Sequence, residues 1–112
     1  MARNPLLGTP PYRVDQVLKK LGGDLKTARL RRRLTAQEVA QKIGTSRYAV
    51  ADAEKGKPST GVAVYVALLW VYGLIDQLSD LADPGADDVG ARLARMREPA
   101  RARRRRELSN DF

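Results

Sequence analysis

The stretch from Thr35 to Gly44 constrains the fold most, because its residues fix both ends of one short helix. Thr35-Ala36-Gln37-Glu38 has the pattern of a capping box, in which the Thr35 hydroxyl accepts from the Glu38 amide and the Glu38 carboxylate accepts from the Thr35 amide. Gly44 is suited to the positive φ at which a helix ends. Between these ends, three apolar residues can face a core: Val39, Ala40 and Ile43.

A second short helix follows directly. Ser46 offers an N-cap for a helix from Arg47 to about Glu54, and Gly56 and Pro58 stop that helix. Two short helices joined through a glycine turn predict a helix-turn-helix motif. The alternative is a helical hairpin that serves packing alone, although packing would not require the basic residues near both ends of the chain.

The rest of the chain is also helical in pattern, and no segment alternates as a strand would. A long helix is predicted from about Val14 to Arg33, weakened or delayed by Gly22–Gly23. Ser59 or Thr60 should cap the next helix, and Asp87 or Asp88 the last one. The later helices predicted are Val62–Tyr72 (closed by Gly73), Ile75–Leu81 and Val89–Met96.

The amino-acid composition excludes several classes of functional site. The 112 residues carry a net charge of +8 and contain no Cys or His, so thiolate zinc sites, Cys nucleophiles and His bases are excluded. We expect no enzyme activity, no metal and no cofactor. A strongly basic small chain favours a nucleic-acid partner, with solubility alone as the alternative. The most apolar stretch, Gly61–Ile75, is short for a bilayer span; without a signal peptide or Cys, a cytoplasmic location is expected, nucleoid-associated when DNA is bound.

The segment "ARLRRRLTAQEVAQKIGTSRYAVADAEKGKPS" resembles the lambda-repressor-like helix-turn-helix domains, often called the XRE family. The resemblance covers about residues 21–75. It implies an all-α, five-helix domain that binds double-stranded operator DNA as a homodimer. It also implies that the helix after Ser46 lies in the major groove.

That resemblance assigns roles by position. Arg47 is the best candidate for a bidentate contact to guanine, and Tyr48 for a thymine methyl group or a phosphate. Lys55 and Lys57 should bind backbone phosphates. The full set of expected DNA contacts is Thr35, Gln37, Thr45, Ser46, Arg47, Tyr48, Ala49, Asp52, Lys55 and Lys57.

Two positions depart from the family pattern. Ala36 stands where a phosphate-clamping glutamine is usual, with Gln37 next to it. Asp52 stands where a neutral or basic residue is commoner, and phosphates repel an acid there. Asp52 could accept from a cytosine amino group. We favour the alternative that it pairs with Arg47, Arg29 or Lys55.

A second resemblance concerns "LWVYGLIDQLSDLADPGADDVGARLA" and the Arg-rich C-terminal end. Both are similar to HipB-like antitoxins, which are encoded beside HipA-like protein kinases. This resemblance implies an antitoxin that binds a HipA-like Ser/Thr-kinase toxin and represses its own operon. The alternatives are a stand-alone or phage-type repressor, or a protein-interaction module that has lost DNA binding.

The chain is therefore expected to divide into a flexible N-terminal arm (1–11), a helix-turn-helix DNA-binding domain (12–82), a turn with a short helix (83–98) and a flexible Arg-rich tail (99–112). Aromatic residues of the fourth helix could form a dimer interface unless they belong to the core: Tyr65, Trp70 and Tyr72. The tail is expected to contact DNA or a protein partner through Arg101, Arg103, Arg104, Arg105, Arg106, Leu108 and Phe112.

Overall fold

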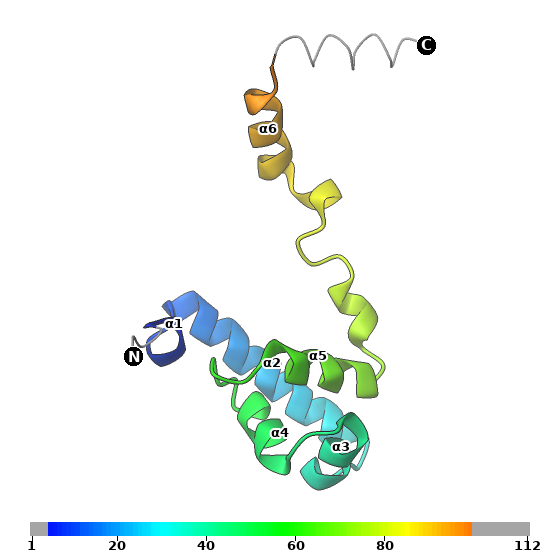
Figure 1. Cartoon of the computed structure of the whole chain (residues 1–112). Helices are drawn as coiled ribbons and strands as arrows, with labels where there is room; N and C mark the ends of the chain where they lie inside the picture. The colour runs from blue at the N-terminus through cyan, green and yellow to red at the C-terminus, as the bar shows by residue number, and fades with distance from the viewer. Residues whose placement is uncertain (1–4, 100–112) are drawn as a thin grey trace. The chain divides into compact units, whose positions relative to one another are not determined.

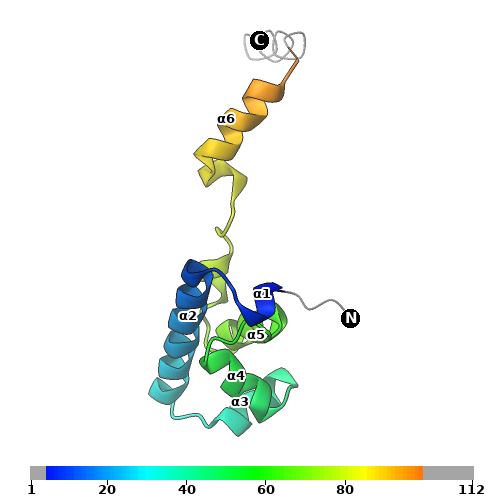
Figure 2. The same ribbon diagram turned by 90° about the vertical axis from the view of Figure 1, so that its left-hand side faces the viewer.

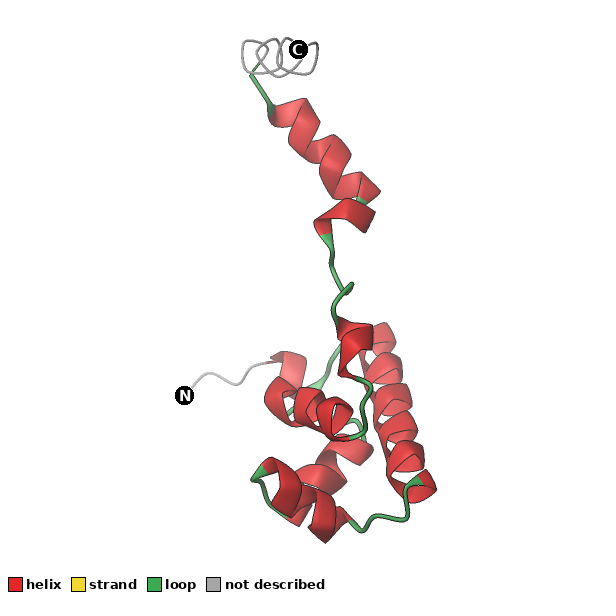
Figure 3. Ribbon diagram, turned by 90° about the vertical axis from the view of Figure 1, so that its right-hand side faces the viewer, coloured by secondary structure: helices red, strands yellow, loops and turns green. Residues whose placement is uncertain are grey.

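The computed structural model describes residues 5–99, and the expectations for the Arg-rich tail lie outside this range. Within it every regular element is a helix (Figures 1 and 3), so the predicted all-α class is confirmed. The chain divides into two units between Asp76 and Gln77. The elements are α1 (Pro5–Gly8), α2 (Tyr12–Arg31), α3 (Ala36–Ile43), α4 (Arg47–Glu54), α5 (Val62–Val71), the 3₁₀ turns η1 (Ile75–Leu78) and η2 (Pro84–Ala86), and α6 (Asp88–Arg97).

The caps of α3 and α4 are those that the sequence predicts. The Thr35 hydroxyl accepts from the Glu38 amide at 3.1 Å, and the Glu38 carboxylate accepts from the Thr35 amide at 3.1 Å. These hydrogen bonds to Thr35 lower the pKa of Glu38. Gly44 ends α3 with φ of 77°, and the Ser46 side chain accepts from the Ala49 amide at the start of α4. Local chemistry therefore determines this helix-turn-helix.

Gly22–Gly23 do not interrupt α2, which is continuous from Tyr12 to Arg31. Gly22 is buried, and its helix α2 packs against α4 (Figure 2). A Cβ on Gly22 would lie 2.5 Å from the Ala53 carbonyl oxygen and 2.7 Å from that of Glu54. The glycine therefore permits close packing of two helices, which compensates for its low helix propensity.

Two other predicted features differ from the structure, and a third, the cap of the last helix, is confirmed. Gly61 occupies the N-cap of α5 and makes no side-chain hydrogen bond there, so neither Ser59 nor Thr60 is the cap. The expected Ile75–Leu81 helix is only the 3₁₀ turn Ile75–Leu78, in a stretch where Asp and Ser side chains compete for backbone groups. At α6 the cap is Asp87, whose carboxylate accepts from the Gly90 amide at 2.9 Å.

The core lies in the N-terminal unit, where α3 packs on α4 and α5, and α2 packs on α4. Its largest fully buried side chains come from four helices: Leu25, Val39, Val50 and Leu68. Tyr65 and Tyr72 are also core residues, at 5% and 4% exposed, whereas Trp70 is 59% exposed. Of the three aromatic residues considered for a dimer interface, only Trp70 therefore has the exposure that such a role needs.

The C-terminal unit, described from Gln77 to Pro99, consists of η2, α6 and their connections. α6 packs against η2. None of the described residues of this unit is buried. Residues 77–99 therefore have capped helical structure without a hydrophobic core of their own.

The two adjacent glycines of α2 provide a matched test of the packing. Gly22→Ala should destabilise the fold by about 1–3 kcal/mol, because the new methyl group meets backbone atoms that cannot rotate away. Gly23→Ala meets nothing within 4 Å and should stabilise the helix by about 0.5–1 kcal/mol. Thermal or urea unfolding followed by circular dichroism measures both, and equal shifts for the two variants would contradict the close contact.

Candidate nucleic-acid interface

The C-terminal end of α4 is fixed to α2 by one ion pair. Arg29 Nε and Nη2 donate to the two Glu54 carboxylate oxygens at 2.7 and 3.0 Å, and Arg29 Nη1 donates to the Leu34 carbonyl at 2.9 Å. Both side chains are largely buried, and the Glu54 hydrogen bonds raise the pKa of Arg29. A bidentate pair restrains orientation as well as distance. The Arg29–Glu54 pair and the close contact at Gly22 together fix the orientation of α4 on α2.

A second arginine joins the ends of two other helices. Arg32 Nη1 donates to the Ala28 carbonyl and Nη2 to the Tyr72 carbonyl, both at 2.9 Å. Its guanidinium group also lies 5.4 Å from the centre of the Tyr72 ring. The sequence suggests only that a cation suits the C-terminal end of a helix. The structure gives Arg32 a specific bridging role between α2 and the end of α5.

The exposed face of α4 carries the residues expected to read DNA. Val50 and Ala53 are buried against the core, which turns Tyr48, Asp52 and Lys55 outward. Arg47 lies at the start of α4, where its guanidinium group stacks 5.1 Å from the Tyr48 ring centre and donates to the Tyr48 hydroxyl at 3.2 Å. Tyr48 is 68% exposed. Arg47 supplies hydrogen-bond donors and Tyr48 an aromatic ring, and the two side chains project together from the N-terminal end of the helix.

Asp52 pairs with a residue that the sequence does not suggest. Its carboxylate lies 3.1 Å from the Lys57 ammonium nitrogen, whereas Arg29 is occupied by Glu54 and Arg47 by Tyr48. The pair forms because the chain folds back at the end of α4, where the Lys57 amide donates to the Asp52 carbonyl. This hydrogen bond brings Lys57 close to the last turn of the helix. The expectation of a pair with Arg47, Arg29 or Lys55 is therefore wrong.

The other residues expected to contact DNA differ in how exposed they are. Gln37 is exposed at the start of α3, but the Thr35 hydroxyl next to it already accepts from Glu38. Thr45 and Ala49 are half-buried, and the Thr45 amide donates to the Ala40 carbonyl in the turn. Gln37 is therefore freer than Thr35 to contact a phosphate.

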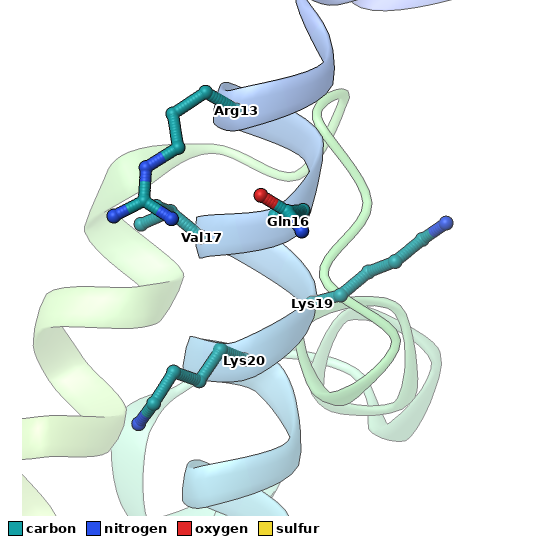
Figure 4. Close-up of a pocket in the computed structure, with 5 residues that line it drawn as sticks. All are labelled: Arg13, Gln16, Val17, Lys19 and Lys20. Carbon is teal, nitrogen blue, oxygen red and sulfur yellow. The ribbon is translucent and has the colours of Figure 1, made fainter.

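A different basic surface lies on the N-terminal half of α2. An open pocket there has a volume of about 400 Å³. Figure 4 shows the side chains that line it: Arg13, Gln16, Val17, Lys19 and Lys20. Lys19 pairs with Asp15 at 3.0 Å and Lys20 with Asp24 at 2.7 Å. Lys19 points away from Lys20 in the close-up. Since carboxylates offset both ammonium groups, this surface is a weaker candidate for a polyanion than the face of α4.

Comparison with known protein families decides the nature of the N-terminal unit. Residues 20–82 match the family described as "Helix-turn-helix domain". The chain belongs to the helix-turn-helix domain family. The match begins within α2, ends after η1 and includes all of α3 and α4, so the motif predicted from the capping residues is confirmed. No curated protein matches the chain, and no solved structure does.

A helix-turn-helix domain of this family indicates a DNA-binding regulator. Within residues 5–99, none of the helices combines the length and apolar composition needed to cross a membrane. The apolar stretch around α5 is explained instead by its buried side chains: Tyr65, Leu68 and Leu69.

The Asp52–Lys57 pair generates a prediction about charge. Asp52→Asn should strengthen binding to random-sequence DNA several-fold, because about 1 kcal/mol of repulsion is removed and Lys57 becomes available to phosphate. Asp24→Asn is the matched control, since it makes the same change to an ion pair on α2. Fluorescence anisotropy at several salt concentrations measures both variants. Equal gains for the two would show that only net charge matters.

Proposed function

We propose that the protein is a sequence-specific repressor that binds operator DNA with α4 in the major groove. The single observation that carries the proposal is the projecting Arg47–Tyr48 pair at the N-terminal end of a helix whose opposite face is buried. An α-helix fits the major groove, and an arginine there can donate two hydrogen bonds to guanine.

The start of α4 also suits a phosphate. The first amides of a helix lack an acceptor within the helix, and the helix dipole places partial positive charge there. Ser46 accepts from the Ala49 amide, which leaves the preceding amides of Arg47 and Tyr48 facing the N-terminal end. Lys55 and Gln37 are exposed on either side and can hold the backbone while α4 reads bases.

We further propose that the protein acts as a homodimer on its operator and regulates its own operon. One eight-residue helix contacts few base pairs, so a repressor of this kind gains specificity by placing two copies on paired half-sites. The resemblance to lambda-repressor-like domains supports this arrangement.

Arg47→Ala should weaken binding to the selected DNA site by about 1–3 kcal/mol, because a base contact is lost. Its effect on random DNA should be the smaller loss expected from one charge. Arg13→Ala removes the same charge from the pocket on α2 and serves as the control. Gel shifts with a site selected from a random pool test both variants, and equal losses would disprove base reading by Arg47.

A protein-interaction module without DNA binding is the alternative from another functional class. The two differ in their response to salt, because each phosphate contact releases a counterion from the duplex. A repressor with several phosphate contacts from cationic side chains, such as Lys55 and Lys57, shows a steep negative slope of log K against log salt. A module that does not bind DNA shows no measurable binding at any salt concentration.

We also propose that the repressor is the antitoxin of a HipA-like kinase. The support is the resemblance of residues 69–94 and of the Arg-rich end to HipB-like antitoxins. The terminal Leu108 and Phe112 add apolar anchors that a tail binding only DNA would not need. We assign the kinase contact to the last residues of the chain.

Co-expression with the product of the neighbouring gene tests this assignment. The full chain should retain the kinase in a pull-down, and a chain ending at Pro99 should lose it while binding the selected DNA site. A stand-alone repressor would retain no kinase in either form, and this result would remove the antitoxin role without affecting DNA binding.

A further inference from the structure

The last described helix carries an apolar stripe that the described residues of its own unit leave exposed. Val89, Leu93 and Met96 are spaced by four and three residues and therefore share one face of α6. They are 58%, 48% and 76% exposed, and the described residues of the C-terminal unit bury no side chain. This stripe is the surface to be explained.

α6 has too little internal support to be stable by itself. It has ten residues, and isolated helices shorter than about 12–15 residues are marginal in water. The Asp87 cap contributes about 1 kcal/mol, and Gly90 inside the helix offsets about the same amount. Burial of the apolar stripe is the remaining source of stability, so the helix needs a partner surface.

We propose that α6 pairs with α6 of a second copy of the chain, antiparallel and about a twofold axis between the levels of Arg92 and Leu93. This register places Val89 of one helix opposite Met96 of the other and brings the two Leu93 side chains together at the centre. The stripe is thereby covered along its whole length. The interface is isologous, as a twofold dimer requires.

The charges of α6 favour this partner and direction. Asp88, Arg92 and Arg95 lie on one flank of the stripe, as the rotation of 3.6 residues per turn requires. In the antiparallel pair, Asp88 lies about 3 Å along the axis from Arg95 of the second copy, at about 1.5 Å per residue. Two such ion pairs offset the approach of the two Arg92 side chains at the axis.

The other arrangements fit less well. A parallel pair would set this flank against the opposite flank of the second copy, which carries Arg97 and no carboxylate, so Asp88 would face no cation and Arg95 would lie near another arginine. DNA could attract the arginines but would leave the apolar stripe in water. A second copy in antiparallel orientation satisfies both the stripe and the charges.

The pairing should be weak in the free protein and stronger on DNA. Three side chains on each helix form a smaller interface than the total buried area of about 1,200–2,000 Å² that is typical of stable complexes. Two helix-turn-helix units bound to one operator raise the effective concentration of their α6 helices. The inference deepens the homodimer of the proposed function, but its test needs no DNA, so each can fail separately.

Disulfide mapping tests the register, because the natural chain contains no Cys. Full-length Val89→Cys and Met96→Cys chains with tags of different size are mixed in a glutathione redox buffer. Mixed disulfide dimers should exceed either like-with-like dimer roughly tenfold, because only opposed positions reach the required Cα separation. Leu93→Cys should form like-with-like dimers. Lys26→Cys on α2 gives the yield of random collision.

Two patterns would overturn the proposal. Predominant like-with-like dimers of Val89→Cys and of Met96→Cys would indicate a parallel pair. Yields no higher than that of Lys26→Cys would indicate that α6 does not pair with itself, as expected if a different protein covers it. Trp70→Ser in the Leu93→Cys chain should leave the yield of disulfide-linked dimers unchanged. Loss of these dimers would place the interface on α5 instead.

Charge exchange tests the partner residues independently. In the Leu93→Cys chain, Asp88→Arg and Arg95→Asp should each lower the disulfide yield, and the double variant should restore it. Each change is unfavourable for the helix dipole, so damage to the helix alone would make the double variant the worst of the three. Restoration therefore supports the ion pairs between copies, and its absence contradicts them.

Discussion

The seating of α4 on α2 is the constraint on which the proposed DNA surface depends. Gly22 lets the backbone of α2 approach the carbonyl groups of Ala53 and Glu54, and the Arg29–Glu54 pair then fixes the orientation at that crossing. A pair of largely buried charges depends on both partners, because removing one leaves the other without compensation. The exposed face of α4 is thus determined by contacts on its opposite face, and Arg47 and Tyr48 project as a result.

Features encoded by neighbouring residues could be predicted from the sequence. The capping box of Thr35 and Glu38, the positive φ of Gly44 and the Ser46 cap each involve residues within a few positions, so the ends of α3 and α4 were predictable. Features that depend on tertiary contact were not. The sequence suggests a break at Gly22 because glycine has a low helix propensity. The contact that explains this glycine, with the end of α4, involves residues about 30 positions further along the chain.

The candidate site shows the same division. The position of Arg47 at the start of α4 follows from local caps, but the partner of Asp52 depends on how the chain turns after Gly56, at φ of 69°. Tyr65 and Tyr72 lie on or beside a helix that is apolar nearly all round, so periodicity could not tell their buried positions from the exposed position of Trp70. Arg32 stands between two other arginines, and the sequence does not distinguish it from them, although its hydrogen bonds are structural.

The central claim, that α4 reads bases in the major groove, is tested most directly by methylation interference on DNA selected by the full-length protein. Dimethyl sulfate modifies guanine N7 in the major groove and adenine N3 in the minor groove, which are the edges exposed there. If α4 reads the major groove, methylated guanines within the selected site prevent binding and methylated adenines do not. Interference by adenine N3 alone, or by neither, would show that α4 does not read the major groove.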